Sequence, residues 1–308
     1  MTTNHPDSSF DPWSDWLLHR RHADDPNYDR LVRSVIERYA DRVLDNARLA
    51  PGMTLADIGS GDGCIAFRAI NRIGPSLRVL LADISLAILQ HAQSLAAQRN
   101  VLPQCTFLQA SAENLSAITD GSVDVVTTRA VLAYIPDKTA ALREFLRILK
   151  PGGRLSIGEP IFRDDACETA ALKNMIDAQP PHSLDPFLPL LHRWKAAQFP
   201  DTQTLIAQNP LTNYSERDLV RFVDAAGFAD IHLELHIDVV PAIVTSWQVF
   251  LGSSPHPLAP TVNTILQEQF TPEERQLFEQ ILRPTIELHP SRNTERIAYL
   301  TAAKPILK

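Results

Sequence analysis

Short apolar runs alternate with amphipathic helical patterns from residue 54 to residue 160, and this alternation limits the possible folds more than any other feature. The runs are nearly continuously apolar, as strands of a parallel sheet covered on both faces must be. They span 54–58, 78–83, 105–110, 123–128 and 154–160. Between them, Ser85 can cap one helix, and KPGG at 150–153 ends another at 137–149. The pattern predicts a doubly wound α/β sheet with helices on both faces.

The regular alternation of strand and helix patterns ends after residue 161. Residues 162–213 and 241–294 are rich in proline, and only TPEERQLFEQIL in the second stretch reads as a clear helix. Between them, YSERDLVRFVDAAGF predicts a capped helix that ends at Gly227, followed by a strand at 231–240. A last strand is predicted at 295–305. Long connections of this kind are typical of lids and binding loops.

The N-terminal stretch DPWSDWLLHRRHADD predicts a further helix, with Asp11 as its cap and Pro12 in its first position. Trp13, Trp16 and Leu17 then share one face. Two interpretations stay open. The face either anchors a terminal helix on the helices that flank the sheet, or it covers a ligand pocket.

Composition excludes several classes of protein. The 308 residues carry a net charge of −7, which argues against a phosphate-binding surface over the whole protein. No run approaches the roughly 18 apolar residues of a membrane span, and the first ten residues do not resemble a signal peptide. The three cysteines lack metal-ligand pairing and fit a reduced, cytoplasmic setting. Asp185 and the neighbouring His182 and His192 lack convincing metal spacing, so we predict no metal.

The strongest local signal is LADIGSGDGC at 55–64. A strand leads into Gly59, Gly61 and Gly63, which allow a sharp turn and let a ligand lie against the backbone. A nicotinamide fingerprint would require Gly or Ala at position 64, where this chain has cysteine. The acidic Asp57 suits a ligand with an ammonium group better than one with a pyrophosphate. Asp83 then closes the second strand, where a carboxylate can accept hydrogen bonds from ribose hydroxyls.

These pieces together resemble the class I S-adenosylmethionine-dependent methyltransferases of small molecules, similar to those of ubiquinone and menaquinone biosynthesis. The matching pieces are LADIGSGDG, LLADIS, LQASAENL, VDVVTTRAVLAYIPD and REFLRILKPGGRLSIGEP, and SERDLVRFVDAAGF extends the match to about residue 227. The resemblance implies a seven-stranded Rossmann-like sheet with an N-terminal helical lid and two insertions. The implied segments are a cap at 1–48, a cofactor-binding core at 49–161, an insertion at 162–213, core again at 214–240, a second insertion at 241–294, and the last strand with the C-terminus at 295–308.

By that resemblance, the cofactor is S-adenosylmethionine and the product S-adenosylhomocysteine. The glycine loop holds the methionine portion and Asp83 holds the ribose, with Ile84 packing on the purine. Ser111 or Glu113 takes the adenine amino group, and the Ala112 amide meets a ring nitrogen. The complete implied set is Asp57, Gly59, Ser60, Gly61, Asp83, Ile84, Ser111, Ala112, Glu113, Thr128 and Arg129.

Candidates for catalysis and acceptor binding follow from strand ends and the added segments. Arg129 can pair with a carboxylate of the acceptor or of the cofactor, and Tyr134 lies where relatives place a pocket residue. These two are the predicted catalytic positions. The predicted acceptor contacts are Trp16, Tyr28, Tyr134, Glu159, Arg163 and Tyr214. No general base is obvious, and methyl transfer needs one only when the acceptor must lose a proton.

The expected acceptor is a small molecule, with a carboxylate-bearing one such as an amino acid or secondary metabolite as one hypothesis, methylated on O, N or S. The base-flipping motif of nucleic-acid methyltransferases is absent after the fourth strand, so no nucleic-acid or membrane partner is expected. A homodimer is compatible with the sequence. Two alternatives stay open: a nicotinamide-dependent oxidoreductase, and a protein that binds S-adenosylmethionine without catalysis.

Overall fold

A computed structural model describes residues 10–180, 183, 185–288 and 291–306, within which seven strands form one sheet. They are β1 (Thr54–Ile58), β2 (Arg78–Asp83), β3 (Cys105–Gln109), β4 (Val123–Arg129), β5 (Leu149–Pro160), β6 (Ala229–Pro241) and β7 (Arg292–Ala303). Their order is β3-β2-β1-β4-β5-β7-β6. The first five pair in parallel, and β7 pairs antiparallel with β5 and β6. The predicted seven-stranded α/β fold is confirmed.

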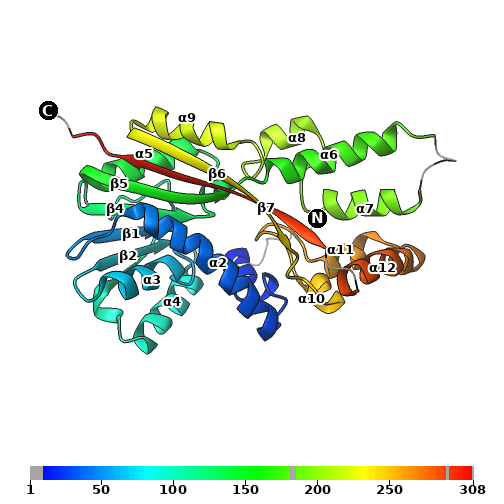
Figure 1. Ribbon diagram of the computed structural model, residues 1–308, viewed down its shortest axis with the longest axis horizontal. Coiled ribbons are helices and arrows are strands. Elements are labelled where there is room, and N and C mark those ends of the chain that lie inside the picture. Colours follow the sequence, from blue (N-terminus) through cyan, green and yellow to red (C-terminus); the bar gives the residue numbers. More distant parts are fainter. Residues whose placement is uncertain (1–9, 181–182, 184, 289–290, 307–308) are drawn as a thin grey trace, which may run out of the picture.

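Helices cover both faces of the sheet (Figure 1). One face carries α2 (Pro26–Ala47), α3 (Cys64–Ile73) and α4 (Leu86–Gln98), and the other carries α5 (Lys138–Ile148) and α9 (Glu216–Ala226). Each layer buries its own apolar cluster against the strands, with Phe67 and Leu81 in the first and Phe145 and Leu155 in the second. Full burial of one such side chain stabilises the fold by about 1.5–3 kcal/mol. The sheet is therefore held rigidly from both sides.

The predicted helix ends are confirmed by their caps. Ser85 accepts a hydrogen bond from the Ile88 amide at the start of α4, and Gly227 ends α9 with a φ of 100°. The helix before KPGG ends at Ile148, one residue before the predicted end. β5, however, begins at Leu149 rather than at residue 154, because Leu149 already pairs with Val123 ahead of a bulge.

The two insertions contain more helices than the sequence predicted. The first holds α6 (Arg163–Asp177), α7 (Phe187–Ala196) and α8 (Gln203–Gln208), and the second adds α10 (Trp247–Gly252) and α11 (Val262–Gln269) to the predicted α12 (Pro272–Glu287). Helices from both insertions share a separate apolar core made of Leu190, Trp247, Val262, Ile265, Leu266, Phe270 and Phe278. Short, proline-flanked helices such as α10 leave too little periodicity to be recognised in the sequence.

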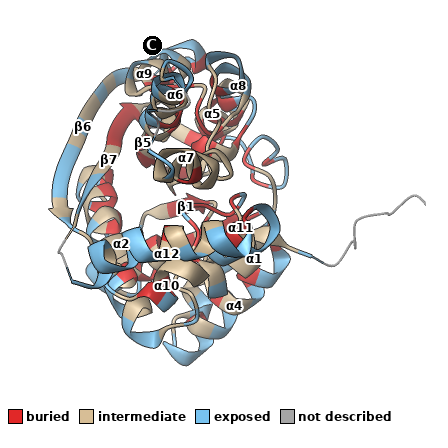
Figure 2. Cartoon of the chain, turned by 90° about the vertical axis from the view of Figure 1, so that its right-hand side faces the viewer, coloured by how far each residue is buried: buried red, intermediate tan, exposed pale blue. Residues whose placement is uncertain are grey.

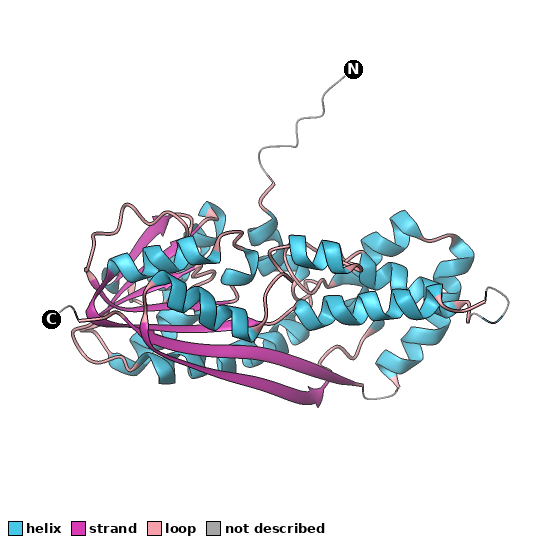
Figure 3. Ribbon diagram, turned by 90° about the horizontal axis from the view of Figure 1, so that it is seen from above, coloured by secondary structure: helices cyan, strands magenta, loops and turns pink. Residues whose placement is uncertain are grey.

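β6 and β7 connect this helical lobe to the rest of the molecule. They pair over nearly their whole length, from Ala229 opposite Ala303 to Pro241 opposite Arg292. Seen from above, the two strands run side by side along the outside of the molecule, from the sheet toward the helical lobe (Figure 3). The core strand predicted at 231–240 thus also supports the second insertion.

The N-terminal segment has two parts. Asp11 caps α1 (Pro12–Asp15), which continues into the π-helical turn η1 (Trp16–Arg20). α2 follows, and its second half is packed against the sheet through Val43 and Ala47. The stretch predicted as a cap at 1–48 therefore includes a core helix, and residues 1–9 lie outside the described part. No helix in the described residues is long and apolar enough to cross a membrane.

Candidate active site

The glycine loop forms a tight turn between β1 and α3. The amides of Gly59 and Ser60 both donate to the Ala82 carbonyl, and the Gly61 amide donates to Asp83 Oδ2 at 2.9 Å. Gly59 has a φ of 64°, and a Cβ there would lie 2.3 Å from Val131 Cγ2. Only glycine fits at that position. Gly63, which precedes α3, has no side chain to cap the helix. The Ala66 amide in the first turn of α3 lies close enough to Asp57 to offset part of the rise that burial causes in the pKa of that carboxyl group.

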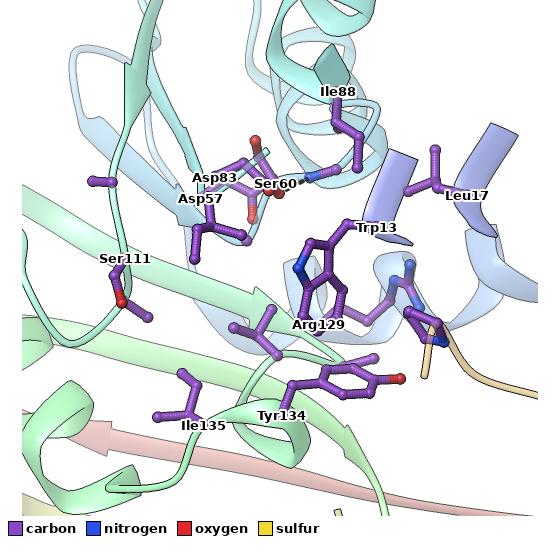
Figure 4. A pocket seen from close by; sticks show the side chains of 18 of the residues that line it. Trp13, Leu17, Asp57, Ser60, Asp83, Ile88, Ser111, Arg129, Tyr134 and Ile135 are labelled. Atoms are coloured by element: carbon purple, nitrogen blue, oxygen red, sulfur yellow. Dashed lines mark hydrogen bonds between the residues drawn. The ribbon is translucent and has the colours of Figure 1, made fainter. Parts of the chain in front are cut away.

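A cavity of about 300 Å³ opens at the carboxyl ends of β1, β2 and β4, where open α/β sheets bind their ligands. In Figure 4, Trp13 reaches from the N-terminal segment toward the side that carries Asp57, Ser60 and Asp83, and Tyr134 lies next to Trp13, farther from those three residues. The full lining is Trp13, Trp16, Leu17, Asp57, Gly59, Ser60, Gly61, Asp62, Cys64, Ile65, Asp83, Ile84, Ile88, Ala110, Ser111, Ala112, Glu113, Arg129, Ala130, Val131, Tyr134, Ile135, Pro136 and Pro257.

Asp57 is a nearly buried carboxylate in this cavity, 2% exposed. Its Oδ1 accepts a hydrogen bond from Thr127 Oγ1 at 3.0 Å, whereas its Oδ2 has no partner among the described residues. Burial raises the pKa of Asp57 to about 7. The Ser60 hydroxyl is likewise buried without a described partner. Buried polar atoms are normally satisfied, so this wall has the character of a binding surface for a polar ligand.

Asp83 joins the glycine loop to the start of α4. Its two oxygens accept hydrogen bonds from the amides of Gly61 and Ser85, at 2.9 and 3.0 Å. Burial also raises the pKa of Asp83. Beside it, Ile84 lines the cavity while 56% exposed, an apolar surface at the cavity mouth.

Ser111, Ala112 and Glu113 line the cavity from the turn after β3. The Ser111 hydroxyl accepts from the Glu113 amide, and the Glu113 carboxylate accepts from the Asp137 amide. Both side chains are thereby held in fixed positions at the rim.

Arg129, at the end of β4, lines the cavity without any hydrogen bond or ion pair to a described residue. Ala130 follows with a φ of 55°, an unusual conformation for a residue with a Cβ. Such strain persists where surrounding contacts enforce it, commonly at functional sites. Tyr134, from the short helix η3 (Leu132–Tyr134), packs edge-on against Trp13 with ring centroids 5.1 Å apart.

Thr128 and Glu159, predicted as cofactor and acceptor contacts, lie behind the cavity wall. Glu159 is fully buried and accepts hydrogen bonds from Thr128 Oγ1 and from the amides of Val131 and Ala133, at 3.1–3.3 Å. Neither side chain lines the cavity. Their hydrogen bonds hold the strained turn between β4 and η3, which carries Arg129 and Tyr134.

Replacing Glu159 with alanine is expected to lower the free energy of unfolding by about 3 kcal/mol, because each buried donor left without a partner costs about 1–3 kcal/mol. Urea unfolding followed by circular dichroism measures the change. Glu168→Ala is the matched control, because Glu168 makes an exposed ion pair with Arg296, worth at most about 1 kcal/mol. Equal losses in the two variants would show that Glu159 does not support the turn.

Three other predicted acceptor contacts also lie outside the cavity lining. Tyr214 is fully buried, with its hydroxyl donating to the Pro160 carbonyl at 2.9 Å and Lys138 Nζ 4.6 Å from its ring centroid. Tyr28 lies in the first turn of α2, and Arg163 begins α6. Arg163 was predicted from its place after the fifth strand, and Tyr28 and Tyr214 from the added segments. None of the three lines the cavity, and Tyr214 has a packing position instead.

The N-terminal segment closes one side of the cavity, with Trp13, Trp16 and Leu17 in its lining. Asp11 fixes it at one end, capping α1 with Oδ1 and accepting from the Ser85 hydroxyl with Oδ2. Trp16 Nε1 donates to the Ser254 carbonyl at 3.0 Å. Arg20 also links the N-terminal segment to the second insertion, because its side chain donates hydrogen bonds to the carbonyls of Pro257 and Ala259.

Several lining residues were not predicted. Trp13 and Leu17 had a usable signal, because they share a helical face with Trp16. Pro257 had none, since it comes from an irregular loop of the second insertion. Among the histidines, His192 pairs with Asp201 at 3.1 Å, and His182 lies outside the described residues. The described residues contain no cluster of three His, Cys, Asp or Glu side chains that could hold a metal.

Comparisons with known proteins agree with this geometry. A family model described as a methyltransferase domain matches residues 49–214. Nocamycin O-methyltransferase of Saccharothrix syringae is 29% identical over 69% of this chain and 71% of its own length. The ubiquinone/menaquinone biosynthesis C-methyltransferase UbiE of Idiomarina loihiensis is 36% identical over 38% of this chain. The alignment spans only 46% of that relative.

Solved structures share the fold at low sequence identity. The YcgJ protein of Bacillus subtilis superposes with a TM-score of 0.54 and 19% identity, covering 87% of this chain and 98% of its own. The [4+2]-cyclase SpnF gives a TM-score of 0.51 and 18% identity, covering 89% of this chain and 83% of its own. Identities this low establish the fold alone.

Proposed function

The chain belongs to the methyltransferase-domain family and is an S-adenosylmethionine-dependent methyltransferase, and from that premise we propose that the cavity receives this cofactor beside a small acceptor bearing a carboxylate. The single observation that carries the acceptor class is Arg129, a cavity-lining cation that makes no hydrogen bond or ion pair with a described residue, although its charge acts on nearby Asp57. An arginine in such a position matches a carboxylate in charge and in geometry.

The residues of the cavity fit the cofactor on two observations. Asp57 Oδ2 is a buried acceptor without a described partner, as an ammonium group would require. A Cβ at Gly61 would project toward Leu17 across the cavity, so glycine leaves that space open for a ligand. When bound, S-adenosylmethionine supplies a methyl group already activated by its sulfonium.

We assign the other cofactor contacts by position along the cavity. Asp57, with Gly59, Ser60 and Gly61, would hold the methionine portion. Asp83 keeps free lone pairs for ribose hydroxyls, although each of its oxygens already accepts one backbone hydrogen bond. Ile84 would pack on the adenine. The adenine edge would meet the turn formed by Ser111, Ala112 and Glu113.

The chain's contribution to the reaction is mainly orientation. Trp13, Trp16 and Tyr134 would form an aromatic wall that excludes water from the acceptor. Arg129 would hold the acceptor by its carboxylate, at the end of a strand whose next turn is fixed by Glu159. Holding two reactants in line can supply much of the acceleration of a bimolecular reaction. An acceptor that needs no deprotonation, such as a thioether or a carboxylate oxygen, would need no general base.

Thermal unfolding with added ligands tests the cofactor. S-adenosylhomocysteine at about 100 times its dissociation constant should stabilise the folded state by about 2.7 kcal/mol. Stabilisation by NADH but not by S-adenosylhomocysteine would overturn the proposal. Methyl transfer from labelled cofactor to a panel of small carboxylic acids then separates an enzyme from a protein that only binds the cofactor.

Arg129→Ala is expected to raise KM about 10- to 100-fold for an acceptor with a carboxylate, because charge-assisted hydrogen bonds contribute about 1.5–3 kcal/mol. The dissociation constant of S-adenosylhomocysteine should stay near that of the wild type. The matched control is the amide of the same acceptor, whose KM should change little. A rise in the dissociation constant of S-adenosylhomocysteine, with acceptor KM unchanged, would assign Arg129 to the cofactor instead.

A further inference from the structure

β6 is the outermost strand of the sheet on one side. Among the described residues it pairs only with β7, so its other edge carries free backbone hydrogen-bonding groups. In Figure 2 it forms the rim of the molecule, with exposed and half-buried residues along its length. Proteins usually protect such an edge with lysine, proline, a bulge or a covering element. β6 has a register shift between Ala229 and His232 and ends at Pro241, but between residues 232 and 240 it contains no lysine or proline and pairs with β7 in regular register.

One face of β6 is apolar and changes from buried to exposed along the strand. Ile231 and Leu233 pack against the main core. Leu235, Ile237 and Val239 continue the same row and are 38%, 58% and 52% exposed. Three large apolar side chains on one exposed strand face favour association with another apolar surface.

The other face of β6 carries alternating charges. His232, Glu234, His236 and Asp238 occupy the intervening positions. Glu234 lies near both histidines, 3.4 Å from His232 Nε2 and 3.2 Å from His236 Nε2, and also pairs with Arg42. His232 and Asp238 are exposed, at the two ends of this row.

The sequence of the strand, IHLELHIDV, is complementary to its own reverse about Leu235. On reversal, apolar residues meet apolar residues, with 231 opposite 239 and 233 opposite 237. Histidines meet acids, with His232 opposite Asp238 and His236 opposite Glu234. Two copies of such a segment can form all of these pairs when they lie antiparallel about a two-fold axis. An interface of this kind uses the same patch on both partners.

We propose that β6 pairs antiparallel with β6 of a second copy of this chain, about a two-fold axis at Leu235, and that the protein is a homodimer with a sheet continuous through both copies. Neighbouring registers are disfavoured by charge. A centre at His236 would place Glu234 opposite Asp238, and a centre at Glu234 would place Asp230 opposite Asp238. Like charges directly opposite each other destabilise a strand pair, whereas opposite charges and apolar pairs stabilise it.

The oligomeric state in solution tests the interface. Sedimentation of the full chain over a dilution series should give a dimer, and Ile237→Lys should give a monomer at the same concentrations. Leu205→Lys is the matched control, because Leu205 in α8 is also a large exposed side chain, 48% exposed, and should leave the dimer intact. Retained stabilisation by S-adenosylhomocysteine in Ile237→Lys would show that the monomer is folded. A monomeric wild type, or a dimer that survives Ile237→Lys, would overturn the proposal.

Cysteine cross-linking tests the register. Leu235→Cys should form a disulfide-linked dimer under mild oxidation, because directly opposite Cβ atoms lie about 4.5–5.5 Å apart. Ile237→Cys should not cross-link, since its own copy would lie four residues, about 14 Å, along the strand. The wild type under the same oxidant controls for Cys64, Cys105 and Cys167. Equal cross-linking at both positions would contradict the register.

A charge exchange provides a second test of the same register. His232→Asp places two acids opposite each other and should raise the dimer dissociation constant by about 10-fold or more. Adding Asp238→His in the same chain reverses the pair and should restore the wild-type value. Failure of the second substitution to rescue the first would show that the two positions do not meet.

Discussion

Gly61→Val is expected to weaken binding of S-adenosylhomocysteine by about 100-fold or more, equivalent to about 2.8 kcal/mol, while the sheet remains folded. A Cβ at this position would lie 3.2 Å from Leu17 Cδ1, and the larger valine side chain would occupy the space between the glycine loop and the N-terminal segment. Gly61 also has a φ of 55°, which a β-branched residue adopts only with strain. Isothermal titration calorimetry measures the affinity.

Gly52→Val is the matched control for Gly61→Val. It introduces the same kind of backbone strain but does not fill the cavity. Gly52 has a φ of 85°, but a Cβ there would have no neighbour within 4 Å. Both variants should lose some stability, since left-handed backbone costs a residue with a Cβ about 1–2 kcal/mol. Only the Gly61 variant should lose its ligand. Full affinity in a folded Gly61→Val protein would count strongly against the glycine loop as the binding surface.

Asp57→Asn is expected to weaken S-adenosylhomocysteine binding about 10- to 100-fold at pH 8 and to abolish the pH dependence of that binding. Burial raises the pKa of Asp57 to about 7, so the carboxyl group of the free protein is largely protonated at pH 6. An ammonium group binds the ionised form. Wild-type affinity should therefore rise as the pH increases through about 7 and then level off, with a proton released on binding below that pH.

The same pKa sets the sign of the stability change. The folded-state pKa of about 7 exceeds the ordinary value of 3.8, so the stabilising contribution of Asp57 is complete below about pH 4 and is lost as the pH rises through 7. In the ligand-free protein, the stability of Asp57→Asn should therefore not fall as the pH rises through 7. Asp124→Asn is the control, because Asp124 lies at the start of β4, at the end away from the cavity. This variant should keep the wild-type pH dependence of ligand binding and of stability. A flat wild-type binding profile would show that Asp57 does not carry the ammonium contact.

The sequence predicted the parts of the site that depend on local structure. Asp57 and Asp83 lie at the carboxyl ends of β1 and β2, and Gly61 lies in the turn after β1, so their common edge could be derived from strand order alone. The orientation of side chains at the strand ends could not. Glu159 was expected to face the ligand, but it turns inward because three donors from Thr128 and the strained turn after β4 need a buried acceptor.

Contributions from the added segments were predictable only where the pattern was periodic. Trp16 belonged to a helical face, and the structure places that face in the cavity lining. Pro257 and the helices α10 and α11 belong to a stretch whose order comes from packing against α7 and the N-terminal segment, through Leu190 and Arg20. Contacts between segments so distant in the chain leave no local signal in a single sequence.

The position of β7 between β5 and β6 has a consequence for the order of folding. β5 and β6 are both synthesised before the strand that joins them, so after β6 has left the ribosome the sheet still lacks its connecting strand. Each of the two strands keeps an open edge until residue 303 is made. Pairings between such distant segments form slowly and leave apolar edges exposed meanwhile. The outer part of this sheet is therefore completed later than the βαβ half that contains β1 to β5.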